Sequence, residues 1–216
     1  MPKLIKMEQT AVIKTITHFE ETKFKEKGSL FIAQAFPLCS VEKIEFEILS
    51  AKKKFFDATH HCYAYRLNNN SYKFSDAGEP NGTAGIRILN AIDHFNLTDI
   101  LVIVIRYFGG TKLGIGPLGK AYYHSTFQTL QSSEIVEKEN YSKIKIITDF
   151  PLMSNIHRLI SNYHAILDKS SYDDKVHFEI LIKNLLKDNF IKELFEISNG
   201  KIKAETLEKN IFIKKN

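Results

Sequence analysis

The chain has 216 residues, of which 44% are hydrophobic and 25% charged, with a formal net charge of +5. This composition is typical of a globular protein and excludes a disordered chain. No apolar segment approaches the roughly 20 residues of a membrane helix, and the start of the chain lacks the apolar core of a secretion signal. We therefore expect a cytoplasmic protein with no membrane partner.

Length and charge also limit the organisation of the chain. Its length fits one large domain, and fits two domains of about 100 residues each at least as well. Residues 1–135 carry 16 Lys and Arg against 13 Asp and Glu, so neither half is a basic block. A nucleic-acid surface would therefore need local placement of cations. Cys39 and Cys62 are too few for a disulfide framework and are interpreted as reduced thiols.

The first half is predicted to mix strands and helices. Its strongest strand, DILVIVIRYF, is almost continuously apolar and predicts a central strand that is buried on both faces. Thr83 is expected as the N-cap of one helix and Pro117 as the first residue of another. In chain order we expect strand 28–38, helix 39–56, strands 60–67 and 72–76, helix 86–95, strand 99–108 and helix 117–133.

The second half is predicted to form a separate domain. The polar residues 132–143 indicate a boundary, which gives domains 1–137 and 138–216. Beyond it the order β-α-β-β-α-β is that of a ferredoxin-like domain, so the fold class is α+β. We expect strand 143–150, helix 151–163, strands 165–172 and 175–183, helix 184–200 and strand 201–213.

Two glycine-rich loops, GEPNGTAG from Gly78 and GGTKLGIG from Gly109, each lead into a helix. Free amides at a positive helix end bind anions, and neither loop has the Walker motif or the dinucleotide fingerprint. The competing interpretation is that the glycines only allow tight turns and close packing. The predicted phosphate site consists of Gly78, Glu79, Gly82, Thr83, Gly85, Arg106, Gly109, Gly110, Lys112, Gly114 and Lys120.

The carboxylates Asp76 and Glu79 lie in or beside the first loop and are candidates for an acid–base pair. The alternative is structural: Asp76 caps a turn, and Glu79 pairs with an arginine. The three candidate arginines are Arg66, Arg87 and Arg106.

The segment HHC raises the question of a metal or a nucleophile. His60 and Cys62 share a strand face, but no further ligand is evident, so neither a metal nor a cofactor is predicted. Cys62 could act as a nucleophile with a neighbouring histidine as its base. This arrangement is disfavoured, because adjacent residues on a strand point to opposite faces. The aromatic residues Tyr63, Tyr65, Tyr107 and Phe108 either stack on bases or belong to the core.

The segments HHCYAYR, FSDAGEPNGTAG, VIVIRYFGG and KLGIGPLGKAY together resemble the IMPACT family, whose bacterial branch is named YigZ. The resemblance covers about residues 18–130, and the second half is similar to the small domain of bacterial members. It implies a first domain like the second domain of a small-subunit ribosomal protein. It also implies a ferredoxin-like second domain similar to the C-terminal domain of elongation factor G.

These observations lead to a main hypothesis and two alternatives. The main hypothesis is a non-enzymatic protein that binds RNA or the ribosome in translation, with His60, His61, Arg66 and Tyr107 as secondary contacts. The first alternative is an enzyme acting on a phosphorylated small molecule or nucleotide, with Asp76 or Glu79 as the base. The second is a module that binds a translation-factor protein through the sheet of the ferredoxin-like domain.

Overall fold

The computed structural model describes residues 11–38 and 40–215. These residues form two compact units, one of residues 13–137 and one of residues 138–215 together with Ala11 and Val12. That the two units are separate folding domains stays a prediction. No helix in the described part of the chain is long and apolar enough to span a membrane.

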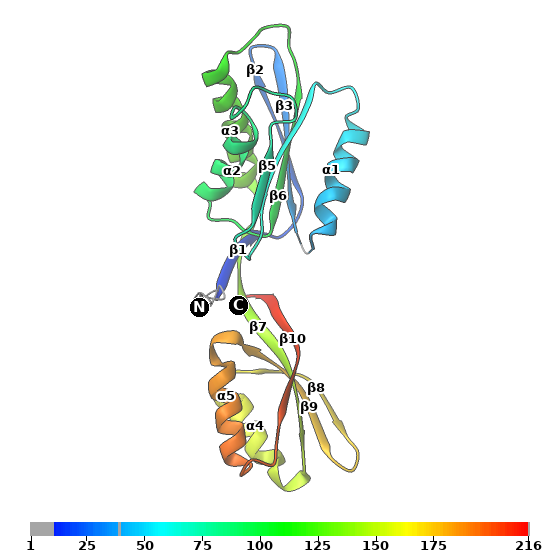
Figure 1. Cartoon of the computed structure of the whole chain (residues 1–216), viewed down its shortest axis with the longest axis vertical. Helices are drawn as coiled ribbons and strands as arrows, with labels where there is room; N and C mark the ends of the chain where they lie inside the picture. The colour runs from blue at the N-terminus through cyan, green and yellow to red at the C-terminus, as the bar shows by residue number, and fades with distance from the viewer. Residues whose placement is uncertain (1–10, 39, 216) are drawn as a thin grey trace, which may run out of the picture. The chain divides into compact units, whose positions relative to one another are not determined.

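The first unit is an antiparallel sheet with helices on both faces (Figure 1). The strand order is β2-β3-β6-β4-β5, with α2 and α3 on one face and α1 on the other. The elements are β1 Val12–Ile16, β2 Glu20–Glu26, β3 Ser29–Pro37, α1 Glu42–Lys54, β4 His60–Arg66, β5 Tyr72–Ser75, α2 Gly85–His94, β6 Ile100–Tyr107 and α3 Ile115–Ser132.

The central strand β6 positions the site. Its residues from Ile100 to Arg106 are all buried, which confirms the strand predicted to be covered on both faces. Side chains on one face pack under α2 and α3, and those on the other face pack under α1. In the ladders, Arg106 lies opposite Phe31 of β3 and opposite His60 of β4. These three side chains therefore point to the same face of the sheet.

Two helices begin earlier than predicted or without the predicted cap. Thr83 is not an N-cap, because α2 begins after Ala84 and the Thr83 hydroxyl donates to the Pro80 carbonyl at 2.6 Å. Pro117 is the third residue of α3, not the first. Gly114 adopts φ of +81°, which glycine reaches without strain, and this lets the chain enter the helix sooner.

Three stretches predicted as polar or irregular are strands. β1 and β2 lie in the polar start of the chain, and β7 begins at Ile135, inside the predicted boundary. β2 is an edge strand that pairs with β3 along its whole length, and only its Phe24 packs against the core. Such segments are strands because they pair with a neighbouring strand. Edge strands tolerate charged residues, whereas a local sequence pattern with many charges predicts a loop.

The second unit has the predicted β-α-β-β-α-β order. The second sheet has the order β1-β7-β9-β8, and β10 also pairs with β7; β1 and β7 each have residues in both units. Apolar side chains from β7, β9, α4 and α5 form its core. The α+β class is thus confirmed, while the likeness to the ribosomal and elongation-factor domains stays a prediction. The elements are β7 Ile135–Thr148, η1 Phe150–Leu152, α4 Met153–Asn162, β8 Ile166–Tyr172, β9 Val176–Lys183, α5 Asn184–Ile197 and β10 Ala204–Lys214.

Candidate anion-binding site

The two glycine-rich loops lie close together on the side of the first sheet that α2 and α3 cover. Glu79 of the first loop bonds to Arg106 at the end of β6. Gly119, in the helix that follows the second loop, packs against α2: a Cβ atom there would lie 3.2 Å from Arg87 Nε and 3.6 Å from the Thr83 carbonyl oxygen. The missing side chain lets the starts of the two helices approach each other.

The Asp76 carboxylate binds the amides of the first loop. Its oxygens accept hydrogen bonds from the backbone N–H groups of Gly82, Ala84 and Gly85 at 2.9, 2.9 and 2.8 Å. A carboxylate of the chain itself therefore stands where a phosphate was predicted. The prediction that Gly82 and Gly85 present free amides to a ligand is wrong, because these donors are already satisfied.

The other predicted ligands of the first loop also have internal roles. Gly78 adopts φ of +88° in the turn, against the ring of His60. Thr83 directs both its amide and its hydroxyl to the carbonyl of Pro80. The first loop is thus a structural turn, as the competing interpretation proposed.

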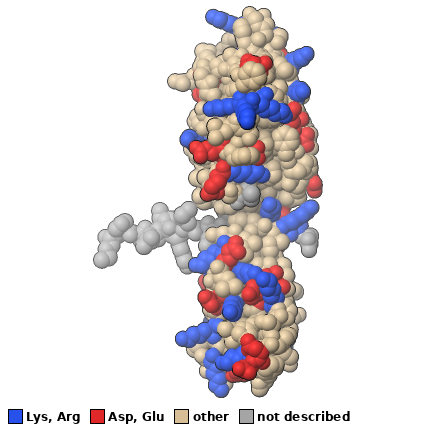
Figure 2. Space-filling view, turned by 90° about the vertical axis from the view of Figure 1, so that its right-hand side faces the viewer, with Lys and Arg blue, Asp and Glu red and all other residues tan. Residues whose placement is uncertain are grey.

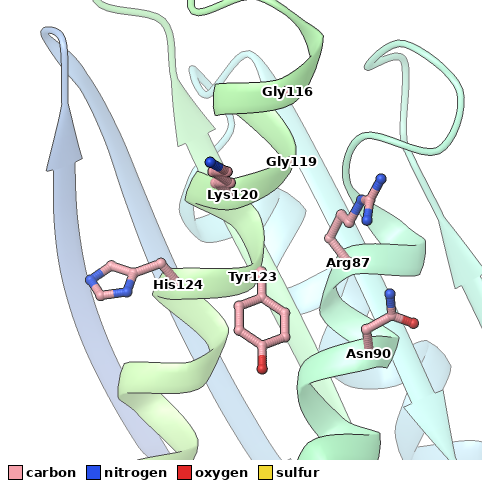
Figure 3. Close-up of a pocket in the computed structure, with 7 residues that line it drawn as sticks. All are labelled: Arg87, Asn90, Gly116, Gly119, Lys120, Tyr123 and His124. Atoms are coloured by element: carbon pink, nitrogen blue, oxygen red, sulfur yellow. The ribbon is translucent and has the colours of Figure 1, made fainter.

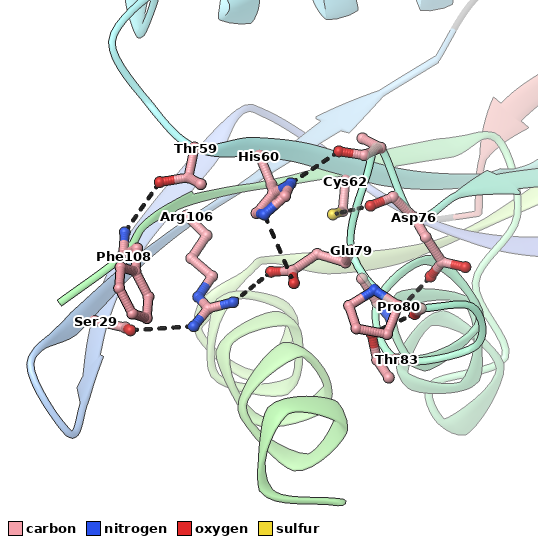
Figure 4. A network of polar contacts seen from close by, with 12 residues as sticks. Ser29, Thr59, His60, Cys62, Asp76, Glu79, Pro80, Thr83, Arg106 and Phe108 are labelled. Carbon is pink, nitrogen blue, oxygen red and sulfur yellow. Dashed lines mark hydrogen bonds and ion pairs between the residues drawn. The ribbon is translucent and has the colours of Figure 1, made fainter. Parts of the chain in front are cut away.

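Glu79 and Arg106 form a buried ion pair at the centre of a polar network (Figure 4). They are 7% and 5% exposed, and Arg106 Nη1 lies 2.6 Å from Glu79 Oε1. The Tyr122 hydroxyl donates to the same carboxylate oxygen at 2.7 Å, and His60 Nε2 lies 3.7 Å from Glu79 Oε2. Arg106 Nη2 also donates to the Ser29 hydroxyl at 3.3 Å. The network joins the first loop to β3, β4, β6 and α3.

Arg106 is not an exposed phosphate ligand, contrary to the prediction. Its guanidinium lies between the rings of Phe31 and Phe108, 5.5 and 5.7 Å from their centroids. Its Nε atom is buried and has no hydrogen-bond partner among the described residues. Of the three arginines considered as partners of Glu79, Arg106 is the one that pairs with it, because the end of β6 lies next to the first loop.

The Cys62 thiol lies in the same buried layer and is unreactive. It donates to the Asp76 carbonyl at 2.9 Å and lies 3.4 Å from the Tyr122 hydroxyl. Burial raises the pKa of Cys62 to about 12, with a smaller opposing effect from Tyr122. Burial likewise raises the pKa of Tyr122. A thiol that stays protonated near neutral pH is not a nucleophile, so the weak nucleophile hypothesis receives no support.

The predicted secondary contacts do not gather at one place. His60 is in the buried network, and its Nδ1 lies 2.9 Å from the Ala77 carbonyl oxygen. Arg66 is paired with Asp93 of α2 at 2.7 Å. His61 and Tyr107 are on the α1 side of the sheet, where His61 Nε2 lies 3.1 Å from the carbonyl oxygen of Phe55.

Two pKa shifts accompany this placement. Burial lowers the pKa of His61, and the hydrogen bond from the Tyr107 hydroxyl to Asp57 raises the pKa of Tyr107. The assignment of His61 and Tyr107 as contacts beside the loops is wrong, because adjacent residues of a strand face opposite ways: His60 and Arg106 face the loops, and His61 and Tyr107 face α1. Tyr63, Tyr65 and Tyr107 pack against the core under α1, so they follow the core interpretation.

The second loop is fixed at its base. Gly109 donates its amide to the Ser29 hydroxyl at 3.3 Å, and Phe108 donates its amide to the Thr59 hydroxyl at 3.1 Å. A Cβ atom on Gly109 would lie 1.9 Å from the backbone carbon of Gly28. Only glycine fits this crossing of two chains.

The tip of the second loop keeps its amides free. In the part of the chain that the structure describes, no hydrogen bond is made by the N–H groups of residues 110–116. Lys112 and the glycines of this stretch are exposed, and the stretch ends in the first turn of α3. Free amides at a helix N-terminus carry partial positive charge, so anion binding by Gly110, Lys112 and Gly114 stays a prediction.

A groove of about 580 Å³ runs beside this loop, between α2 and α3 (Figure 3). Arg87 and Lys120 are exposed cations on its two walls, and Figure 3 shows Arg87 and Tyr123 in the gap between the helices. Arg87 Nε donates to the Gly82 carbonyl at 3.3 Å, which leaves the guanidinium end free for another group. The lining residues are Arg87, Asn90, Gly116, Gly119, Lys120, Tyr123 and His124.

Sequence reasoning predicted Lys120 but missed the other polar residues of the groove. Arg87 was considered only as a partner of Glu79, and Asn90 and His124 were not considered. One signal could have located this wall: the chain has no Asp or Glu from Ile100 to Ser133. Cations in that stretch have no acidic neighbour in sequence to neutralise them.

No site for a metal was found among residues 11–38 and 40–215: no three His, Cys, Asp or Glu side chains are placed to hold one. Asp76 and Glu79 accept hydrogen bonds from different partners, and His60 and Cys62 bond to backbone carbonyls. The polar network therefore has the features of a buried structural network.

Comparison with known proteins identifies the family. The model of the Impact N-terminal domain matches residues 27–130, and a domain of unknown function, DUF1949, matches residues 146–201. The IMPACT family member YvyE of Bacillus subtilis is 30% identical over 189 residues, which is 87% of each chain. The chain belongs to the IMPACT family. The predicted resemblance is thereby confirmed.

Other IMPACT-family relatives agree over most of the chain. The family member YigZ of Escherichia coli is 27% identical over 186 residues, which is 84% of this chain and 91% of the relative. A solved structure described as a hypothetical protein has a TM-score of 0.65, at 24% identity, and covers 92% of this chain and 98% of its own. That likeness shows that the fold is shared.

Proposed function

We propose that this IMPACT-family chain binds RNA through phosphate groups and acts in translation. The proposal rests on one observation, the groove between α2 and α3 with Arg87 and Lys120 on its walls. The free amides of residues 110–116 lie at the start of the same helix that carries Lys120. The family membership supports the link to translation, because the resemblance implies domains like those of a ribosomal protein and of elongation factor G.

The chemistry of the groove suits a phosphodiester backbone. The guanidinium of Arg87 binds two phosphate oxygens at once, and Lys120 adds a point charge on the facing helix. Asn90 adds an uncharged hydrogen-bonding group. Since α3 has no acidic residue, nothing on that wall repels a polyanion. The ligand set differs from the predicted one: Lys120 stays, Arg87 joins, and Arg106 with the first loop leaves.

The enzymatic alternative receives less support from the geometry. A general base needs a carboxylate that can reach the substrate. Glu79 is buried and bonded to Arg106 and Tyr122, and Asp76 is held by three amides. The groove is nevertheless within the usual volume range of small-ligand pockets, so the test below includes a nucleotide.

The decisive experiment measures binding of a fluorescently labelled single-stranded RNA dodecamer by the full chain at several salt concentrations. For the wild type, log K falls linearly as log salt rises. The double variant Arg87→Ala with Lys120→Ala is expected to bind more weakly and to flatten that slope by about 1–2, since two phosphate contacts are lost.

Lys23→Ala with Lys25→Ala is the matched control. Both lysines are exposed on β2, on either side of Phe24, so they point away from the face that α3 covers. This variant changes the net charge equally and is expected to keep the wild-type slope. Equal slopes for all three proteins would refute the proposal. Binding of AMP with no binding of RNA would assign the groove to a small molecule instead.

A protein-binding role for the second unit is favoured by a separate observation. Every residue of β8 is exposed, including the large apolar side chains of Ile166, Leu167 and Tyr172. Binding of a purified translation factor that is lost on deletion of residues 141–216, while RNA binding is retained, would support this role. Retention of the factor by the shortened chain would exclude it.

A further inference from the structure

The helix α1 has a large apolar surface that no other described element of the first unit covers. Its inner face packs against the sheet through Ile44, Ile48 and Ala51. Its outer face carries Phe46 and Leu49, which are 66% and 62% exposed. Figure 1 shows α1 alone on its side of the sheet, opposite α2 and α3. Two large apolar side chains so fully in water indicate a contact surface.

The spacing along the outer face is that of a helix-pairing seam. Glu42, Phe46, Leu49 and Lys53 follow one another at intervals of four, three and four residues. This alternation keeps side chains in line on one side of a helix and is the spacing by which paired helices interdigitate. The two central positions are apolar and the two end positions are charged.

The charges along α1 are arranged by sign. Its first turn holds Glu42 and Glu45, and its last turn holds Lys52, Lys53 and Lys54. Figure 2, which views this side of the first unit, shows a band of basic side chains with acidic side chains beneath it. One end of the apolar surface is therefore acidic and the other basic.

This arrangement is complementary to itself when reversed. In an antiparallel pair of α1 helices, the register that places Phe46 against Leu49 of the second copy also places Glu42 against Lys53 of the second copy. The twofold axis repeats both contacts, as in any interface between identical copies. A uniformly acidic partner segment would oppose Lys53 well but would meet Glu42 and Glu45 with like charge.

We infer that α1 is a dimerisation helix, which pairs in antiparallel orientation with α1 of a second copy of this chain. The inference is independent of the RNA site, which lies on the opposite face of the sheet. A helix of 13 residues is about 20 Å long, so the contact is smaller than a standard protein interface. Phe56, just beyond the helix, is also 84% exposed. The dimer is thus a weak one, in exchange with monomer.

The first test is sedimentation equilibrium of the full chain from low to high concentration. The wild type is expected to shift reversibly from monomer to dimer. Phe46→Ser with Leu49→Ser is expected to remain monomeric at every concentration, and because both side chains are exposed the fold is retained. A wild type that stays monomeric up to about 1 mM, or a serine variant that still dimerises, overturns the inference.

The second test exchanges the charges at the ends of the seam. Lys53→Glu places Glu against Glu at both ends, and Glu42→Lys places Lys against Lys, so each variant alone is expected to dimerise about tenfold more weakly. An equimolar mixture of the two variants restores opposite charges at both ends and is expected to form heterodimers with nearly wild-type affinity.

The mixture distinguishes this register from every other mode of association. A variant that merely damaged the helix would not recover on mixing, and circular dichroism of each variant checks the helix directly. Lys120→Glu, a charge reversal on α3 at the opposite face of the sheet, is the control and is expected to leave dimerisation unchanged. No recovery in a mixture of two folded variants overturns the inference.

Discussion

The two glycine-rich loops each lead into a helix, but they use their backbone amides in opposite ways. In the first, residues 78–85, the amides bind the carboxylate of Asp76, and Glu79 turns inward to Arg106. In the second, the amides of residues 110–116 have no partner among the described residues and lie beside an exposed groove. Glycine at a helix start creates a place for negative charge, and the rest of the chain decides whether that charge is its own.

The largest expected effect on stability tests the buried side of this comparison. Arg106→Ala leaves Glu79 charged, buried and without its main partner, so the free energy of unfolding should fall by about 3–5 kcal/mol. Arg87→Ala, a change of the exposed arginine in the groove, should alter it by less than about 0.5 kcal/mol. Urea denaturation of both variants measures the difference. Equal losses would mean that the two arginines do not differ as described.

Thiol reactivity tests how well the same region is closed. In a Cys39→Ser background, Cys62 is the only thiol. Its pKa of about 12, against 9.0 for a free thiol, leaves about a thousandfold less thiolate at pH 8. A disulfide reagent should therefore react about a thousandfold more slowly with the native chain than with the chain in urea, and faster as pH rises towards 12. A native rate equal to the unfolded rate would show that the region is open.

Alanine substitutions at two glycines of the second loop test the difference between its fixed base and its free tip. Gly109→Ala places a Cβ atom 1.9 Å from the backbone carbon of Gly28, so one of the two backbone segments must shift and a loss of about 3 kcal/mol is expected. Gly116→Ala meets nothing within 4 Å and lies in the first turn of α3, so it should be neutral or slightly stabilising. Thermal denaturation of the pair measures this contrast. A destabilised Gly116→Ala variant would show that the tip is packed after all.

The smallest of these expected losses of stability tests the Asp76 carboxylate, which fills the first loop. Asp76→Ala removes the acceptor of three amides, and water can replace part of it at this half-buried position. A loss of about 2 kcal/mol is expected. Asp76→Asn keeps one carbonyl acceptor and should lose less. If added phosphate raises the melting temperature of Asp76→Ala by more than that of the wild type, the first loop has regained an anion site.

Patterns within short segments predicted much of the fold. The unbroken apolar run of β6 indicated a strand buried on both faces, and the element order of the second half was correct. Both depend on burial of contiguous side chains, which periodicity records directly. β2 was missed because its single core residue, Phe24, gives no pattern, and only pairing with β3 makes the segment a strand.

The candidate site was less predictable, because pairing of charges is a long-range property. Three arginines were plausible partners for Glu79, and each has a different place: Arg106 is buried with Glu79, Arg66 bonds to Asp93, and Arg87 remains at the groove. Alternation along the strands placed His61 and Tyr107 on the far face of the sheet. None of these outcomes follows from spacing along the chain.

The sequence alone determined the family, the α+β class, the core strands and the presence of two loops suited to negative charge. These depend on residue type and local spacing, which a single chain displays. The tertiary structure alone decided that one loop is filled by Asp76, that Arg106 is internal, and that Arg87 of α2 and Lys120 of α3 line the same groove. Such choices depend on which residues of distant segments meet, since desolvation and charge pairing act through space.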